Sequence, residues 1–185
     1  DPQTLEFCAS RGINPGYFLI YPRPGAAPRY IKFLEDWKKA GWPKKPNIAY
    51  CTIVYVDETD DKALRVGLAR AARAYEGFLP PPKPNESFEQ RVREHAKKFI
   101  GRGEPGASEI MANLFDADYL MKHELVFIGS PETVARKIQA AAQAGLFNVF
   151  MGEFNFSDLP EDDLMRSIRL FGEKVVPALR GYEPF

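Results

Sequence analysis

The 185-residue chain has the composition of an ordinary folded protein, with 45% hydrophobic and 27% charged residues. Its 25 basic and 25 acidic residues balance to a formal net charge of +0, so no basic surface is expected to bind nucleic acid. No apolar run approaches the ~18 residues that a membrane span requires. The two cysteines have no neighbours at metal-ligand spacing. We therefore predict one domain over residues 1–185, a cytoplasmic location and no metal site.

Helix and strand patterns alternate from the N-terminus. Residues 2–11 repeat apolar side chains at helical spacing, and Gly12 can end that helix in a left-handed conformation. The aromatic and β-branched run 17–21 predicts a strand, and the proline-rich and glycine-containing residues 22–25 predict a turn after it. Apolar residues at helical spacing then predict a second helix over 30–41.

The middle of the chain contains one strongly apolar strand and one irregular stretch. Residues 48–56 are apolar without alternation, which is typical of a parallel strand covered on both faces. Thr59 can cap the helix that follows. The regular pattern is lost over 80–124, where a proline run precedes a polar helix with Ser87 as its cap and Gln90 reaching back. We interpret 80–124 as an inserted helical excursion.

The C-terminal part returns to alternation. Residues 125–128 predict a strand, Ser130 caps a helix over 131–145, residues 146–154 predict another strand, and 161–176 predict a last helix. Strands alternating with amphipathic helices indicate βαβ crossovers. The sequence therefore predicts an α/β fold with a mainly parallel sheet.

The strings FIGSPETV (127–134) and RSIRLFGEKVVPAL (166–179) resemble the closing signature of the luciferase-like superfamily of flavin-dependent oxidoreductases. VYVDET (54–59) resembles the strand and cap before its sixth or seventh helix, and TLEFCA (4–9) resembles its helix after the fifth strand. The strand predicted near 145–154 fits its last barrel strand.

This resemblance implies that the chain is the C-terminal half of a (β/α)8 TIM barrel, with parallel strands alternating with helices. Complete barrels typically have about 250 residues and rarely fewer than about 200. An isolated half-barrel would expose two strand edges and apolar helix faces. The implied partner is therefore a second subunit or a complementing N-terminal half.

The resemblance also implies an activity. The parent protein would be an FMN-dependent monooxygenase that uses reduced FMN and O2 to oxidise a small organic substrate, with a flavin reductase as a further partner. The family's catalytic residues would lie in the half that is absent here. We therefore expect the chain to be inactive alone, and its own catalytic residues stay unknown.

The start of the first helix is the best candidate for a cofactor site. Asp1 can act as the N-cap, which leaves the amides of Gln3 and Thr4 and the Thr4 hydroxyl at the positive end of the helix, where phosphate groups bind. By resemblance, Thr4 holds the FMN phosphate. The alternative is a well-capped helix without a ligand, and the charge of Asp1 would repel a phosphate.

Two tyrosines of the first strand, Tyr17 and Tyr21, are candidates to line the flavin or substrate cavity. The alternative is that they are core residues, as aromatic residues in strands usually are. Glu153, Asn155 and Ser157 follow the last strand, where barrel enzymes carry functional loops. Helix capping explains that polar loop equally well.

The remaining titratable residues have simpler explanations. His95 and His123 have no second ligand at metal spacing, and we expect both to be solvated. Asp57 and Glu58, like the acidic residues 161–163, lie at predicted helix starts, where the helix dipole accounts for them.

Three rival functions stay open at this point. An oxidoreductase that uses the deazaflavin coenzyme F420 for hydride transfer would share the barrel and the terminal helices. A non-catalytic, flavin-binding or associating subunit would keep the fold without the chemistry. A generic α/β binding domain would have no affinity for flavin.

Overall fold

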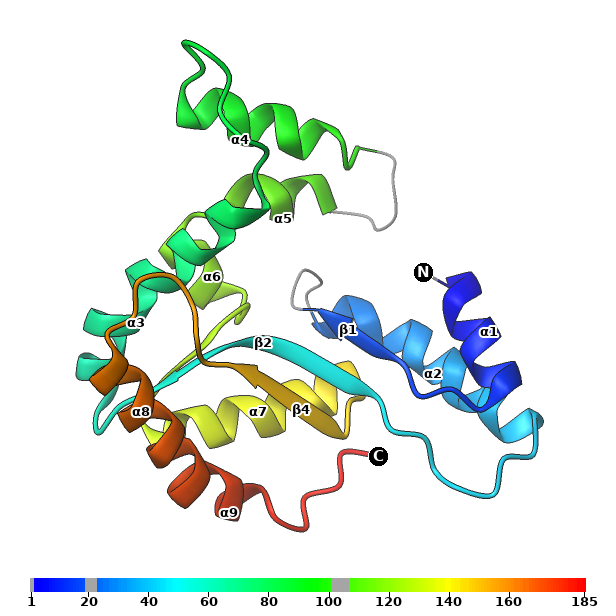
Figure 1. The fold of residues 1–185 in the computed structure, drawn as a ribbon. Helices are drawn as coiled ribbons and strands as arrows, with labels where there is room; N and C mark the ends of the chain where they lie inside the picture. The colour runs from blue at the N-terminus through cyan, green and yellow to red at the C-terminus, as the bar shows by residue number, and fades with distance from the viewer. Residues whose placement is uncertain (1, 19–22, 101–106) are drawn as a thin grey trace.

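The computed structural model describes residues 2–18, 23–100 and 107–185, and their helices and strands alternate as predicted (Figure 1). The element order is α1 (Pro2–Arg11), β1 (Gly16–Phe18), α2 (Arg23–Lys39), β2 (Ala49–Val56), α3 (Asp60–Ala74), the 3-10 turn η1 (Tyr75–Phe78), α4 (Phe88–Lys97), α5 (Ala107–Asn113), α6 (Ala117–Lys122), β3 (Phe127–Gly129), α7 (Pro131–Gly145), β4 (Val149–Glu153), α8 (Glu161–Leu170), the π-helical turn η2 (Phe171–Val175) and α9 (Val176–Leu179).

The sheet is parallel throughout, and β2 is its central strand. Along its first part β2 pairs with β1 and with β4, in a register that joins Gly16 to Ala49 and Ala49 to Val149. Its last part pairs with β3, where Val54 lies opposite Phe127. Within the described residues, β1 and β4 pair with β2 alone. The predicted parallel α/β fold is therefore confirmed as an open sheet.

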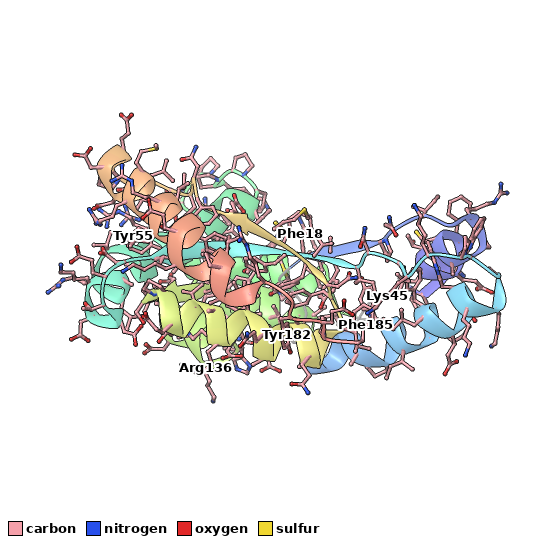
Figure 2. The ribbon with its side chains drawn as sticks, turned by 90° about the horizontal axis from the view of Figure 1, so that it is seen from below. Phe18, Lys45, Tyr55, Arg136, Tyr182 and Phe185 are labelled. Carbon is pink, nitrogen blue, oxygen red and sulfur yellow. The ribbon has the colours of Figure 1, made fainter. Side chains whose placement is uncertain are left out.

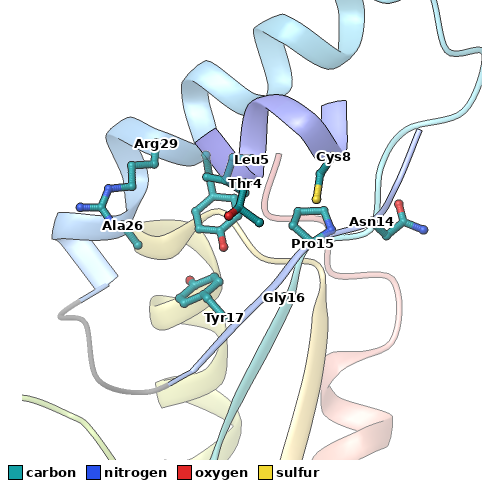
Figure 3. Close-up of a pocket in the computed structure, with 10 residues that line it drawn as sticks. Thr4, Leu5, Cys8, Asn14, Pro15, Gly16, Tyr17, Ala26 and Arg29 are labelled. Atoms are coloured by element: carbon teal, nitrogen blue, oxygen red, sulfur yellow. The ribbon is translucent and has the colours of Figure 1, made fainter. Parts of the chain in front are cut away.

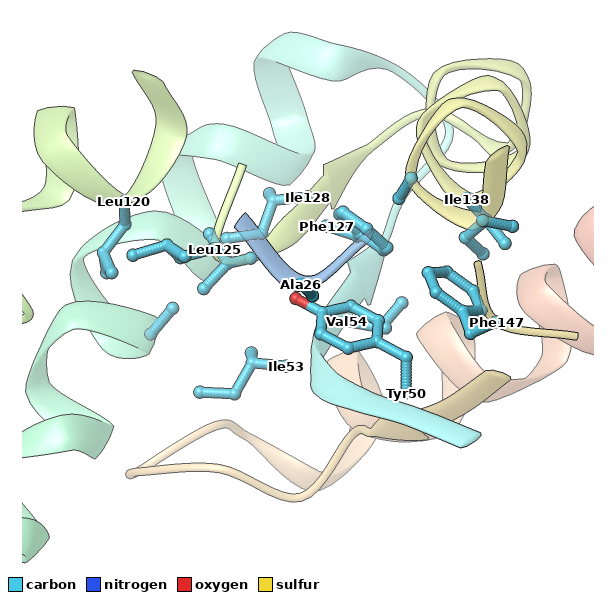
Figure 4. Close-up of a cluster of buried hydrophobic side chains, with 14 of the residues drawn as sticks. Ala26, Tyr50, Ile53, Val54, Leu120, Leu125, Phe127, Ile128, Ile138 and Phe147 are labelled. Atoms are coloured by element: carbon cyan, nitrogen blue, oxygen red, sulfur yellow. The ribbon is translucent and has the colours of Figure 1, made fainter. Parts of the chain in front are cut away.

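One face of the sheet carries an aromatic core. Tyr17, Tyr50 and Phe150 are in register on the three adjacent strands, so their side chains share a face. Tyr50 is fully buried and stacks on Phe147, with ring centroids 4.9 Å apart, and Phe127 lies 6.3 Å from it (Figure 4). Helices α2 and α7 and the turn η2 contribute side chains to this core. The helices therefore cover this face of the sheet.

Several helix ends follow the predicted capping. Thr59 accepts a hydrogen bond from the Lys62 amide, and Ser130 accepts one from the Thr133 amide. Ser87 forms a full capping box with Gln90 at the start of α4. These predictions are confirmed because each cap depends only on residues close in sequence.

Other boundaries differ from the prediction. Helix α2 begins at Arg23, so the predicted turn over 22–25 is wrong from that residue onward, since proline is well tolerated in a first helical turn. Helix α7 ends at Gly145 as predicted, and Leu146 after it takes a left-handed conformation, with φ of 55°. The last helix continues beyond its predicted end, through η2 and α9 to Leu179, so Pro177 does not end it.

The residues predicted as an excursion form the helices α4, α5 and α6, and Figure 1 shows α4 and α5 extending away from the sheet. Phe88 of α4 and Phe115 after α5 pack edge to face at 5.5 Å. The division of the chain into one domain with an excursion stays a prediction.

At the other end of the molecule, Lys45 lies 4.7 Å above the ring of Phe185, and Figure 2 shows the two side by side.

None of the described helices is long and apolar enough to cross a membrane. In the same part of the chain, no three His, Cys, Asp or Glu side chains gather in a way that could hold a metal ion.

Gly129, the last residue of β3, packs against the starts of α3 and α7, and replacing it should lower the stability of the protein. A Cβ atom at this position would lie 2.8 Å from Asp60 Oδ1 and 2.7 Å from Thr133 Cγ2. Asp60 accepts hydrogen bonds from the Ser130 amide at 2.6 Å and the Thr133 hydroxyl at 3.0 Å. Gly129→Ala should therefore lower the free energy of unfolding by about 1–2 kcal/mol.

Urea denaturation followed by circular dichroism measures this change. Gly172→Ala is the matched control, because nothing lies within 4 Å of a Cβ atom there. Equal stability of the two variants would contradict the predicted clash.

Candidate functional site

A cavity of about 290 Å³ lies between α1, β1 and α2 (Figure 3). The residues that line it come from these three elements and from the loop between α1 and β1, and are Thr4, Leu5, Cys8, Asn14, Pro15, Gly16, Tyr17, Ala26, Arg29 and Tyr30. The structure thus brings Thr4 and Tyr17, two of the predicted site residues, to one cavity. Gln3, the third predicted site residue that the structure describes, is not among those that line it.

Thr4 lies in the first turn of α1, at the positive end of the helix dipole. Its side chain is exposed, and this first turn contains no acidic residue among those described. Figure 3 shows the side chains of Thr4 and Tyr17 at the cavity, whereas the Arg29 side chain extends away from Thr4. Gln3 is exposed in the same turn. This turn has the amides, hydroxyl and dipole that an anionic group requires.

Asp1 and Tyr21 lie outside the described residues. Their predicted roles, Asp1 as part of the cofactor site and Tyr21 as a cavity residue, stay predictions.

Tyr17 lies on the helix-covered face of the sheet. Its ring packs 4.8 Å from that of Tyr30 and 5.0 Å from that of Tyr50, and its hydroxyl donates to the Gly145 carbonyl at 2.9 Å. The hydroxyl is therefore held by the end of α7. Tyr17 was predicted either to line a cavity or to belong to the core, and it does both, because its ring packs in the aromatic core and also lines the cavity. Its role toward a substrate stays a prediction.

Tyr30 contributes a buried polar group to the cavity. The side chain is 5% exposed, and burial raises the pKa of its hydroxyl above the ordinary value, while the nearby charge of Arg29 lowers it in part. The sequence shows Tyr30 only as one of a helical series of apolar residues, so its place beside Thr4 could not be predicted.

The opposite face of the sheet is uncovered along the first part of β2, whereas Ile53 and Tyr55 farther along that strand are buried. Phe18, Cys51 and Met151 are in register on β1, β2 and β4 and so form one row across the sheet. Phe18 is 59% exposed and Met151 is 46% exposed. Glu153, which the sequence indicated after the last strand, ends β4 on this same face. In a (β/α)8 barrel the face opposite the helices is the interior.

The other polar residues after β4 have structural explanations. Ser157 donates a hydrogen bond to Asp158, and Asp158 forms an ion pair with Arg73 of α3 at 3.0 Å. Asn155 is exposed. These contacts fit the capping and loop alternative for this segment.

A buried ionic cluster was not predicted from the sequence. Asp57, directly after β2, is 2% exposed and accepts a hydrogen bond from Arg166 of α8 at 3.0 Å. Arg166 also contacts Asp163 and the Tyr55 hydroxyl. Burial opposes the charge of Asp57, but the hydrogen bond from Arg166 and the Glu58 amide hold the pKa of Asp57 below its usual value. The helix-dipole interpretation of Asp57 is therefore wrong.

The two histidines lie in the excursion. His95 is half-buried and packs 5.3 Å from the ring of Phe99, and its Nδ1 atom is buried without a hydrogen-bond partner. Burial, followed by the charge of Lys98, lowers the pKa of His95. The predicted solvated state is wrong for this residue, because a polar helix still packs one side against neighbouring apolar groups. His123 packs against Tyr119 with tilted rings, whose centroids are 4.2 Å apart.

Comparison with known proteins gives structural matches without sequence matches. No model of a known protein family matches the chain, and no curated protein matches it either. The monooxygenase RslO1 from Streptomyces bottropensis matches with a TM-score of 0.64 at 18% identity, over 95% of this chain and 45% of that one. The oxygenating constituent of 3,6-diketocamphane monooxygenase from Pseudomonas putida, a type II Baeyer-Villiger enzyme solved with FMN, matches with a TM-score of 0.62 at 20% identity, over 94% and 44%.

A third match uses another cofactor. The coenzyme F420-dependent tetrahydromethanopterin reductase from Methanopyrus kandleri has a TM-score of 0.51 at 22% identity, over 96% of this chain and 48% of that one. Over nearly all of its length the chain therefore has the fold of less than half of each of these solved proteins, which confirms the predicted half-barrel resemblance at the level of the fold. It spans less than half the length of the solved chains that it matches.

Proposed function

We propose that this chain forms part of a flavin-dependent monooxygenase barrel that oxidises a small organic substrate with reduced FMN and O2. The observation that carries the proposal is the cavity at the start of α1, where Thr4 lies at the positive end of a helix. The fold that the chain shares with two monooxygenases supports it. Catalytic side chains would come from barrel units other than those described here.

The residues present fit the phosphate end of such a cofactor. Thr4 offers a hydroxyl and an amide, Gln3 offers a second amide, and the α1 dipole favours a negative group. When bound, the flavin supplies the redox chemistry with O2, and the protein binds and shields it. In this proposal Thr4 and Gln3 bind the phosphate, and Tyr17 supports the wall of the cavity.

The proposal includes partners and a location. Among the described strands, β1 and β4 each have one side without a partner, which favours completion of the barrel by further β/α units from a complementing N-terminal half or a second subunit. A flavin reductase would supply reduced FMN. We place the protein in the cytoplasm, where a chain with two unpaired cysteines stays reduced.

A second candidate is a coenzyme F420-dependent hydride-transfer oxidoreductase, which the likeness to the F420-dependent reductase favours. Both cofactors carry a phosphate, so the same helix start would serve either one. They differ because FMN ends in a phosphomonoester, whereas F420 extends beyond a phosphodiester.

The phosphate site is tested by flavin binding. The chain should bind FMN about tenfold more tightly than riboflavin, which lacks the phosphate; tenfold corresponds to about 1.4 kcal/mol, within the range of a charge-assisted hydrogen bond. Thr4→Val should remove most of this preference. Titration with each flavin, followed by the quenching of flavin fluorescence, measures it.

Ser10→Ala is the control, because Ser10 lies at the far end of α1 and donates to the Phe7 carbonyl. It should leave the FMN preference unchanged. Equal affinity of the unaltered chain for FMN and riboflavin would overturn the phosphate site, and tighter binding of F420 than of FMN would favour the second candidate.

A further inference from the structure

Two tyrosines line the cavity at the start of α1, and their hydroxyl groups differ in what they contact. The Tyr17 hydroxyl donates to the Gly145 carbonyl at 2.9 Å, so its proton already has an acceptor within the chain. Among the residues that the structure describes, none accepts a hydrogen bond from the Tyr30 hydroxyl. Because a buried tyrosine hydroxyl usually has a hydrogen-bond partner, we expect an acceptor to occupy the cavity beside Tyr30.

The ring of Tyr30 is fixed in the wall of the cavity. The residue is 5% exposed, and its ring packs 4.8 Å from Tyr17 and edge to face against Phe33 at 6.4 Å. Because this packing already fixes the ring, little side-chain freedom would be lost when the hydroxyl binds a ligand. Burial raises the pKa of the Tyr30 hydroxyl above its ordinary value, so the group keeps its proton at neutral pH and can donate it to an acceptor.

The surroundings of the Tyr30 hydroxyl favour an acceptor with negative charge. Among the described residues that line the cavity, Arg29 is the only charged one, and it is close enough to act electrostatically on Tyr30. Thr4 lines the same cavity from the positive end of α1. The cavity therefore combines a helix start with a buried donor from a second helix, α2, and a phosphate group can accept hydrogen bonds from both.

We propose that Tyr30 is a specificity-determining residue whose hydroxyl donates a hydrogen bond to a phosphate group bound at the start of α1. This inference rests on the proposed function, since it adds a residue to that phosphate site, where the phosphate is the one of FMN. Bound in this way, the phosphate joins α1, through Thr4, to α2, through Tyr30. Riboflavin has no such group, so it leaves the Tyr30 hydroxyl without a charged acceptor.

Flavin binding by Tyr30→Phe tests the proposal on the full chain, because this change removes the hydroxyl and keeps the ring. The preference for FMN over riboflavin should fall from about tenfold in the unaltered chain to about threefold, a loss within the range of one hydrogen bond. The affinity for riboflavin should stay the same. Titration with each flavin, followed by the quenching of flavin fluorescence, measures both affinities.

Tyr75→Phe is the matched control. Tyr75 is 2% exposed, but it lies in η1 and is not among the residues that line the cavity. This variant should keep the FMN preference of the unaltered chain. An equal loss of affinity for FMN and riboflavin in Tyr30→Phe would overturn the proposal, because the hydroxyl would then act on the packing of the cavity and not on the phosphate.

Inorganic phosphate separates this inference from the proposed function. Its binding, followed by the line width in phosphorus NMR, should weaken about threefold in Tyr30→Phe and stay unchanged in Tyr75→Phe. Phosphate binding that depends on Tyr30, without a preference for FMN over riboflavin, would support the phosphate site and overturn the flavin function. A preference for FMN that Tyr30→Phe leaves intact, together with unchanged phosphate binding, would overturn the role of Tyr30 alone.

Discussion

Replacing Phe147 by alanine should lower the free energy of unfolding by about 3–5 kcal/mol, the usual cost of truncating a buried phenylalanine. Phe147 is 1% exposed and begins the segment that leads into β4. Its ring stacks on Tyr50 at 4.9 Å and also contacts Tyr17 at 6.3 Å and Phe150 at 6.3 Å. Removing it would leave a void where α7, β1, β2 and β4 meet.

Urea denaturation followed by circular dichroism measures this loss. Phe7→Ala is the control, because the Phe7 side chain is 56% exposed on α1 and its removal should change stability by less than about 0.5 kcal/mol. Phe147→Leu should fall between the two. A loss below about 1 kcal/mol for Phe147→Ala would mean that the aromatic core is not the centre of the fold.

The fold could be predicted because its signals are local. The uniformly apolar run that became β2 has one interpretation in an α/β protein, since a central parallel strand is covered on both faces. The capping residues Ser87 and Ser130 bond to amides three positions away, so their partners are visible in the sequence. Element types therefore followed from spacing alone.

Strand order and long-range pairing could not be predicted in this way. The sequence places β3 between β2 and β4, yet β4 pairs with the first part of β2 and β3 with the last part. Asp57 and Arg166 are 109 positions apart, and an acidic residue before a helix has a sufficient local explanation in the dipole. The position of Asp57 directly after a buried strand does indicate a buried carboxylate, but it does not identify Arg166 as the residue that pairs with it.

The candidate site was predicted only in part. Thr4 is recognisable because a helix start with a hydroxyl is a local feature, and Tyr17 because it lies in a short aromatic strand. The residues that complete the cavity, Arg29 and Tyr30, come from α2, and only the packing of α1 against α2 brings them there.

Replacing Arg166 by methionine should lower the free energy of unfolding by about 2–3 kcal/mol at pH 7, because it leaves the buried Asp57 carboxylate without its cation. This expected loss of stability is smaller than that for a fully buried ion pair, because the Arg166 side chain is 36% exposed. Arg169→Met is the control, because Arg169 is exposed on the same helix and should change stability little. Urea denaturation at pH 7 compares the two variants.

The pH dependence of this loss identifies its cause. The folded-state pKa of Asp57 is lowered by Arg166, so the pair stabilises the protein above the unfolded-state pKa of about 3.9 and this stabilisation is lost as the pH falls through the lower folded-state pKa. The difference between Arg166→Met and the unaltered chain should therefore be largest near neutral pH and shrink as the pH falls, starting at the pKa of the unpaired Asp57 carboxyl, which burial raises in the variant, and ending at the lower pKa of the paired carboxyl. A deficit that stays constant from pH 7 to pH 3.5 would instead assign the effect of Arg166 to its packing on α8, because the hydrocarbon part of the side chain does not titrate.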